Sequence, residues 1–172
     1  MEENYVTISD SEGTGCRGYI GNQRQGEQHI WLSKDDADAD KDCYTDGKIA
    51  HELLHAYGLY HEHLRPDRSD YIQINYNNIR DYSKNVAKFK KMDHLPTYGV
   101  PYDGRSLMHY SSMYLSKGDG HPTMESVNFP EMSVVLFGKL VPGSGTHMVP
   151  KANIVKQHKI PQAPQLPSCC LF

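Results

Sequence analysis

The stretch HELLHAYGLYH, residues 51–61, decides the fold and the chemistry expected of this chain. Residues four apart lie on one face of an α-helix, so His51 and His55 can present two imidazoles to one metal ion. Glu52 lies one position further on, beside the ion, where a base is needed to take a proton from a water molecule. The stretch therefore predicts a helix that carries two metal ligands and a base.

A third ligand has to come from outside that helix face. Gly58 tolerates the positive φ that turns the chain back, and this turn brings His61 under the ion. A His-Glu-x-x-His pattern alone also occurs by chance on helices with surface histidines, but Gly58 and His61 at this spacing favour a metal site. Three neutral imidazoles leave one coordination position open, which is typical of catalytic zinc sites. Zinc in such a site lowers the pKa of water to about 7, so that Glu52 can deprotonate it near neutral pH.

Apolar periodicity and turn residues predict a mixed set of elements. The helix that carries the ligands is expected over 45–57, with Thr45 or Asp46 as its N-cap and Gly58 just beyond its end. Runs of β-prone residues predict short strands at 5–8, 16–20, 28–32 and 71–74. Further helices are expected at 79–91 and near 151–158, and a brief apolar run covers 134–137.

Composition excludes two classes of function. The 172 residues fit one soluble domain, and the formal net charge is −3. The densest basic cluster is Lys88, Lys90 and Lys91, so nucleic acid is not expected as a partner. No apolar stretch approaches the roughly 18 to 20 residues that a membrane span needs. The first residues also lack the pattern of a signal peptide, so an export signal is expected to lie outside this chain.

Two further stretches extend the pattern beyond the third histidine. They are EHLRPDRSDYIQIN, residues 62–75, and YDGRSLMHY, residues 102–110. Together with residues 51–61 they resemble the astacin metallopeptidases, a family of the metzincins. The resemblance implies an α+β, metzincin-like fold in which residues 1–172 form one partial peptidase domain of two lobes. A twisted sheet and the long zinc helix would form the N-terminal lobe, 1–61, and 62–172 a mostly irregular C-terminal lobe, with the metal in a cleft between them.

The resemblance also implies roles that spacing alone does not assign. Met108 would lie in a tight turn at 106–110, the Met-turn, as an apolar floor beneath the metal. Tyr110 would be an additional zinc ligand at rest, and would then move to donate a hydrogen bond to the oxyanion of the tetrahedral intermediate. Glu62 would reach the amino terminus of the mature enzyme through water. Without the resemblance, Met108 and Tyr110 would be interpreted as a core methionine and a half-buried tyrosine.

The resemblance also has implications for the cysteines and for one edge of the sheet. Cys16 and Cys43 match a disulfide of the family, and they lack the close Cys-x-x-Cys spacing of a zinc knuckle. The strand at 28–32 would correspond to the edge strand that binds an extended substrate by β-augmentation. The N-terminal part of the family's domain is expected to be missing here, together with the cysteine that would pair with Cys169 or Cys170.

The leading hypothesis is therefore a secreted or extracellular zinc endopeptidase that holds one Zn²⁺ per chain and cleaves an extended protein or peptide substrate. An alternative is a module that binds zinc but is catalytically inert. The terminal CCLF, residues 169–172, also matches a prenylation signal, which the resemblance to secreted proteins contradicts. Surface or packing roles are expected for the other histidines, which are His29, His63, His94, His109, His121, His147 and His158.

Overall fold

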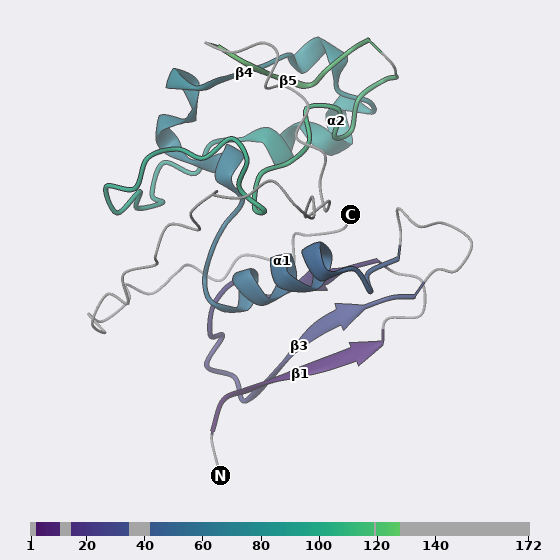
Figure 1. The fold of residues 1–172 in the computed structure, drawn as a ribbon, viewed down its shortest axis with the longest axis vertical. Helices are drawn as coiled ribbons and strands as arrows, with labels where there is room; N and C mark the ends of the chain where they lie inside the picture. Colours follow the sequence, from purple (N-terminus) through teal and green to yellow (C-terminus); the bar gives the residue numbers. More distant parts are fainter. Residues whose placement is uncertain (1–2, 11–14, 35–41, 119, 128–172) are drawn as a thin grey trace, which may run out of the picture.

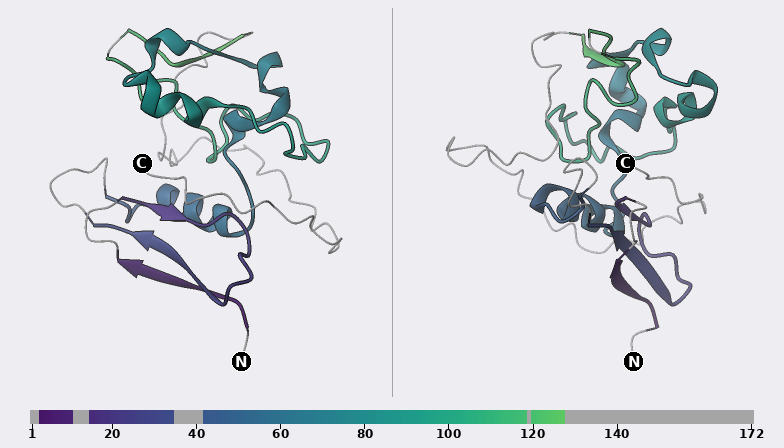
Figure 2. Two further views of the ribbon diagram at one scale, coloured as in Figure 1. Left: turned by 180° about the vertical axis from the view of Figure 1, so that it is seen from behind. Right: turned by 90° about the vertical axis from the view of Figure 1, so that its right-hand side faces the viewer.

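The computed structural model describes residues 3–10, 15–34, 42–118 and 120–127. The expected elements at 134–137 and 151–158 lie outside these residues, as do Cys169 and Cys170. Two halves are visible in Figure 1, with the three-stranded sheet and α1 in one half and α2, β4 and β5 in the other. The views in Figure 2 show the same division, with the chain crossing between the halves after α1.

Helix α1 spans Asp46–Ala56, within the range predicted from its apolar periodicity. Its start is capped by Thr45, whose side-chain oxygen accepts a hydrogen bond from the backbone N–H of Lys48 at 3.4 Å. Its end is followed by Gly58 at φ +96°, a conformation that residues with a Cβ rarely adopt. The cap and the glycine therefore fix the length of the helix, and with it the direction in which the chain continues toward His61.

The sheet of the first half has the strand order β1-β3-β2. Strand β3, Glu27–Leu32, pairs in parallel with β1, Tyr5–Asp10, and antiparallel with β2, Arg17–Gly18. The expectation that 28–32 forms the edge of the sheet is thus wrong, because β3 is hydrogen-bonded on both sides and the edge strands are β1 and β2. Alternation along β3 correctly indicated one buried face, but alternation does not reveal which strands are neighbours.

Packing of α1 against the sheet forms the first of two small cores. Ile30 and Leu32 of β3 are buried together with Cys16 and Cys43, and Ile49 and Ala56 of α1 pack against them. Cys16 and Cys43 form a disulfide with a Cα–Cα distance of 5.5 Å. This bond ties the segment before β2 to the segment before α1, so it links the edge strand β2 to the helix that carries His51 and His55.

The second half contains little regular structure, as expected for the region after His61. Its short elements are η1 (Glu62–Leu64), η2 (Pro66–Asp70), β4 (Ile72–Ile74), η3 (Tyr76–Asn78), α2 (Tyr82–Asn85), η4 (Val86–Phe89) and β5 (Met124–Ser126). Strands β4 and β5 pair antiparallel. Buried Ile72, Ile79, Phe89, Tyr110 and Met124 form the second core.

The helix expected at 79–91 is reduced to one α-helical turn, α2, and the 3-10 turn η4. Asp81 has φ +46°, in the left-handed region, which separates Ile79 from α2. Ile79 instead forms an isolated bridge with Ser116. Tertiary pairing therefore overrides the helical pattern of this stretch. Among the residues that the structure describes, no helix has the length and apolar character that crossing a membrane would require.

Candidate metal centre

Three histidine side chains converge at the C-terminal part of α1. The helix carries His51 and His55 on one face, and the turn at Gly58 returns the chain so that His61 meets them just before η1. One potential ligand atom from each of the three lies within 4.8 Å of the other two. All three residues are buried, with exposed fractions of 2%, 0% and 3%. The structure thus brings together the three residues that the sequence predicted as ligands.

Backbone carbonyls orient two of these rings. The Nδ1 atom of His51 lies 2.8 Å from the carbonyl oxygen of Leu107, and Nδ1 of His55 lies 2.8 Å from that of Leu59. A carbonyl oxygen can only accept, so Nδ1 carries the hydrogen in both rings and Nε2 is the unprotonated nitrogen. Partners of this kind fix the tautomer and orientation of metal-binding histidines.

Burial keeps the three imidazoles neutral. It lowers the pKa of His51 to about 4, helped by the nearby His55. The pKa of His55 is lowered by burial, and that of His61 falls well below its usual value because of burial and the surrounding histidines. The neutral ring is the form that binds a metal, so the cluster needs to release few protons on binding near pH 7.

The spacing of the ring nitrogens fits a zinc ion. The Nε2 atoms of His51 and His61 lie 3.2 Å apart. Two nitrogens bound tetrahedrally to one zinc, each at about 2.0–2.1 Å, lie about 3.3 Å from each other. The donor set, and the spacing of this pair of nitrogens, therefore fit a three-histidine zinc site.

Glu52 is enclosed beside this cluster. It has no exposed surface, and neither carboxylate oxygen has a hydrogen-bond partner among the described residues. Burial raises its pKa to about 8. A cation held by the three histidines would favour the ionised carboxylate and lower this pKa. The unpartnered carboxylate is thus a second feature that fits a metal ion at this place.

The Met-turn, residues 106–110, closes the cluster from the second half of the chain. The Leu107 carbonyl of this turn contacts Nδ1 of His51, as described above. The Met108 carbonyl accepts a hydrogen bond from the backbone N–H of Glu62 at 2.8 Å. Met108 and Tyr110 are both buried. The ring of Tyr110 lies 4.3 Å from the ring of His61 and stacks on that of His63 at 4.1 Å, centroid to centroid. Tyr110 is therefore a direct neighbour of the histidine cluster.

A model of the peptidase family Astacin matches residues 1–138. The chain belongs to the astacin family. Zinc metalloproteinase nas-14 of Caenorhabditis elegans is 37% identical over 121 residues, which cover 70% of this chain and 22% of the relative. Blastula protease 10 of Paracentrotus lividus is 37% identical over 118 residues, 68% of this chain and 18% of the relative. The chain thus spans about a fifth of the length of these two curated relatives.

A solved structure supports the astacin fold. High choriolytic enzyme 1, a hatching enzyme zinc-protease from Oryzias latipes, superposes with a TM-score of 0.68 and 29% identity. The match covers 79% of this chain and 62% of that chain. The α+β fold and the family predicted from residues 51–110 are therefore confirmed.

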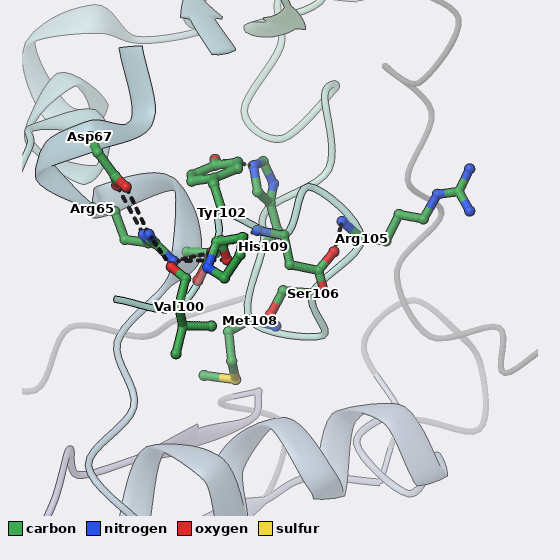
Figure 3. A network of polar contacts seen from close by, with 11 residues as sticks. Arg65, Asp67, Val100, Tyr102, Arg105, Ser106, Met108 and His109 are labelled. Atoms are coloured by element: carbon green, nitrogen blue, oxygen red, sulfur yellow. Dashed lines mark hydrogen bonds and ion pairs between the residues drawn. The ribbon is translucent and has the colours of Figure 1, made fainter. Parts of the chain in front are cut away.

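Glu62 of this astacin-family chain has an internal partner. Its Oε1 atom accepts hydrogen bonds from Nη1 of Arg65 and from the backbone N–H of Asp103, both at 2.9 Å. Arg65 also forms a bidentate pair with Asp67, at 2.9 and 2.7 Å, and donates to the Val100 carbonyl at 2.9 Å (Figure 3). Burial raises the pKa of Glu62, and Arg65 opposes that shift. The expected contact of Glu62 with a mature amino terminus stays a prediction.

A chain of polar contacts that the sequence did not predict ends in the turn 106–110. The Tyr102 hydroxyl lies 2.6 Å from Nε2 of His109 (Figure 3). Nδ1 of His109 lies 2.6 Å from the Tyr110 carbonyl oxygen. His109 was expected to have only a surface or packing role, because it has no ligand spacing to another histidine. The only signal in the sequence was its position between Met108 and Tyr110.

Proposed function

We propose that this chain is a zinc-dependent endopeptidase that hydrolyses internal peptide bonds, with His51, His55 and His61 as ligands and Glu52 as general base. The observation that carries the proposal is the convergence of three buried, neutral imidazoles beside a buried carboxylate that has no hydrogen-bond partner among the described residues. The kinship with zinc metalloproteinases supports it, since it supplies the same reaction class.

When bound, zinc polarises the scissile carbonyl and lowers the pKa of water to about 7. Glu52 takes a proton from the attacking water and later returns it to the leaving amine. Tyr110, a neighbour of His61, donates its phenolic hydrogen to the developing oxyanion. Met108 provides a buried apolar floor for the ligands, so each residue has a distinct role.

The substrate is proposed to be a protein or peptide bound in extended form along β2. This strand is one of the two edges of the sheet, and its Gly18 lies against Glu52: a Cβ built on Gly18 would come within 3.2 Å of Oε2 of Glu52. A peptide added to this edge by β-augmentation would therefore pass next to the base. The disulfide of Cys16 and Cys43 favours an oxidising compartment, so we propose a secreted or extracellular location.

A module that binds zinc but does not cleave is the second candidate. The observation that favours it is the complete burial of Glu52, because a general base must reach the water it activates. In that case His51, His55 and His61 would hold zinc for structure alone, and no peptide would be hydrolysed.

The chain and its Glu52→Gln variant are compared in two measurements, which together distinguish the candidates. One is the zinc content, and the other is cleavage of a quenched-fluorescence peptide library. This substitution keeps the shape of the side chain and removes the base, so we expect one zinc in both proteins and a loss of cleavage of roughly a hundred- to ten-thousand-fold. The matched control is Glu125→Gln, at a glutamate in β5, which should cleave like the parent. Chelation should abolish cleavage, and added zinc should restore it.

Each alternative result has a clear meaning. If both proteins hold zinc and neither cleaves, the inert module is correct. If neither protein holds zinc, the metal site itself is wrong. Should Glu52→Gln cleave as fast as the parent, the assignment of the base to Glu52 has to be given up.

A further inference from the structure

Two short hydrogen bonds connect Tyr102 to the backbone of Tyr110. The Tyr102 hydroxyl lies 2.6 Å from Nε2 of His109, and Nδ1 of the same ring lies 2.6 Å from the Tyr110 carbonyl oxygen. His109 is 5% exposed, so its ring is shielded from water, and its bond to the Tyr110 carbonyl is buried. Figure 3 shows the ring of His109 beside that of Tyr102.

The direction of both bonds follows from the carbonyl. A carbonyl oxygen only accepts, so Nδ1 of His109 carries the hydrogen and Nε2 is an acceptor. Tyr102 must then be the donor to Nε2. The Tyr110 carbonyl therefore sets the tautomer of His109, and the Tyr102 hydroxyl bonds to the other nitrogen and orients the ring.

Tyr102 itself is held firmly. Its ring stacks on that of Tyr71 at 4.8 Å with an interplanar angle of 6°, and the guanidinium of Arg65 lies 5.4 Å from its centroid. Arg65 is fixed in turn by Asp67 and the Val100 carbonyl. Burial raises the pKa of Tyr102, which keeps its hydroxyl protonated as a donor. The Tyr102 hydroxyl, which is the donor at the start of the chain of hydrogen bonds, is thus held in place by the packing of its ring and stays protonated.

The side chain of Tyr110 is confined separately from its backbone. Its ring packs between the rings of His61, His63 and Tyr114, with centroid distances of 4.3, 4.1 and 4.0 Å. No regular secondary structure holds the Met-turn, which contains only turns and bends. Backbone hydrogen bonds hold its other residues, from Glu62 to the Met108 carbonyl and from His109 to the Ser106 carbonyl, and the bond from the His109 ring holds the Tyr110 carbonyl.

We propose that Tyr102 and His109 are positioning residues, which hold the backbone of Tyr110 so that its phenol meets the three-histidine site. The inference rests on the proposed function, because it takes Tyr110 to act at the zinc. Without the Tyr102 hydroxyl, Nε2 of His109 loses its donor and the ring loses the contact that orients it. The hydrogen bond from Nδ1 to the Tyr110 carbonyl is then held from one side only and weakens.

The first test is a double-mutant cycle in the zinc-loaded chain. Tyr102→Phe removes the hydroxyl and retains the stacked ring; we expect kcat to fall about 10- to 100-fold, as for other outer partners of metal sites, with little change in KM. In a Tyr110→Phe background, the same substitution should cause no further loss. Tyr71→Phe is the matched control, since it removes a hydroxyl from the ring stacked on Tyr102, and it should leave kcat unchanged.

Two readouts are independent of activity. In the copper-loaded chain, a Tyr110 phenolate ligand should give a charge-transfer absorption band that is absent in Tyr110→Phe, weaker or shifted in Tyr102→Phe, and unchanged in Tyr71→Phe. In the metal-free chain, NMR should show the hydrogen of His109 on Nδ1 in both proteins, exchanging slowly with water in the parent and faster in Tyr102→Phe, where its bond to the Tyr110 carbonyl is weaker. Dispersed NMR spectra also establish that each variant is folded.

The outcomes separate this inference from the function on which it rests. If the parent cleaves but shows no band, and Tyr110→Phe cleaves equally well, the role of Tyr110 fails and the positioning role falls with it. If the parent shows the band while Tyr102→Phe matches the parent in kcat, band and exchange of the His109 Nδ1 hydrogen, the inference is overturned and the proposed function stands. Additive losses in the cycle would also overturn it, because Tyr102 would then act by another route.

Discussion

Gly18 shows how a single side chain can constrain the proposed base. A Cβ built on Gly18 would lie 3.2 Å from Oε2 and 3.3 Å from the backbone oxygen of Glu52. Contacts this short force the carboxylate to move by a few tenths of an ångström. The absence of a side chain at residue 18 is therefore part of the geometry of the site.

Gly18→Ala should lower kcat on the order of tenfold, because small displacements of catalytic groups are costly, and should leave zinc content unchanged. Steady-state kinetics and metal analysis measure both. Gly104→Ala is the matched control, since a Cβ there meets nothing within 4 Å, and it should behave like the parent. An unchanged kcat in Gly18→Ala would mean that Glu52 adapts without loss, or that it is not the base.

At the scale of elements, the end of α1 determines where the third ligand lies. Gly58 has φ +96°, and its backbone N–H donates to the carbonyl oxygen of His55 at 2.8 Å. A residue with a Cβ is strained in this conformation. The helix end is thus tied directly to the position of His61, three residues later.

We expect Gly58→Ala to lower the free energy of unfolding by about 1–2 kcal/mol and to weaken zinc binding, since relief of the strain displaces His61. Urea denaturation and a competitive zinc titration measure the two effects. Gly104→Ala, at a glycine without a positive φ, should not destabilise the chain. Wild-type stability and zinc affinity in Gly58→Ala would show that the turn tolerates a Cβ.

For the whole molecule, the disulfide is the covalent link between the segment before β2 and the segment before α1, the helix that carries His51 and His55. Cys16 and Cys43 are both buried and are separated by 27 residues. Replacing both with alanine should lower the free energy of unfolding by about 3–4 kcal/mol, mainly through the entropy of the unfolded chain. Denaturation midpoints with and without reductant check this.

The reduced parent serves as the control for that experiment. It should lose about as much stability as the double-alanine variant, and reductant should have no effect on the variant itself. Equal stability of the oxidised parent and the variant would show that the link contributes nothing to folding.

Much of the site was predictable because it is local in the sequence. His51, Glu52 and His55 are placed by helical spacing, and Gly58 redirects the chain toward His61 within a few residues. The strand order was not predictable, because alternation in β3 reports a buried face and not its neighbours. The helix expected at 79–91 failed for a similar reason, since the pairing of Ile79 and the left-handed Asp81 are tertiary effects.

The sequence by itself determined the ligand helix, the turn after it and the family, because these depend on short-range spacing and on three linked stretches. Only the tertiary structure decided that β2 is the edge next to Glu52, that Arg65 binds Glu62, and that Tyr102 reaches Tyr110 through His109. These contacts join separate turns and strands through single hydrogen-bond donors and acceptors. No periodicity records such a pairing, so only the folded chain reveals which groups meet.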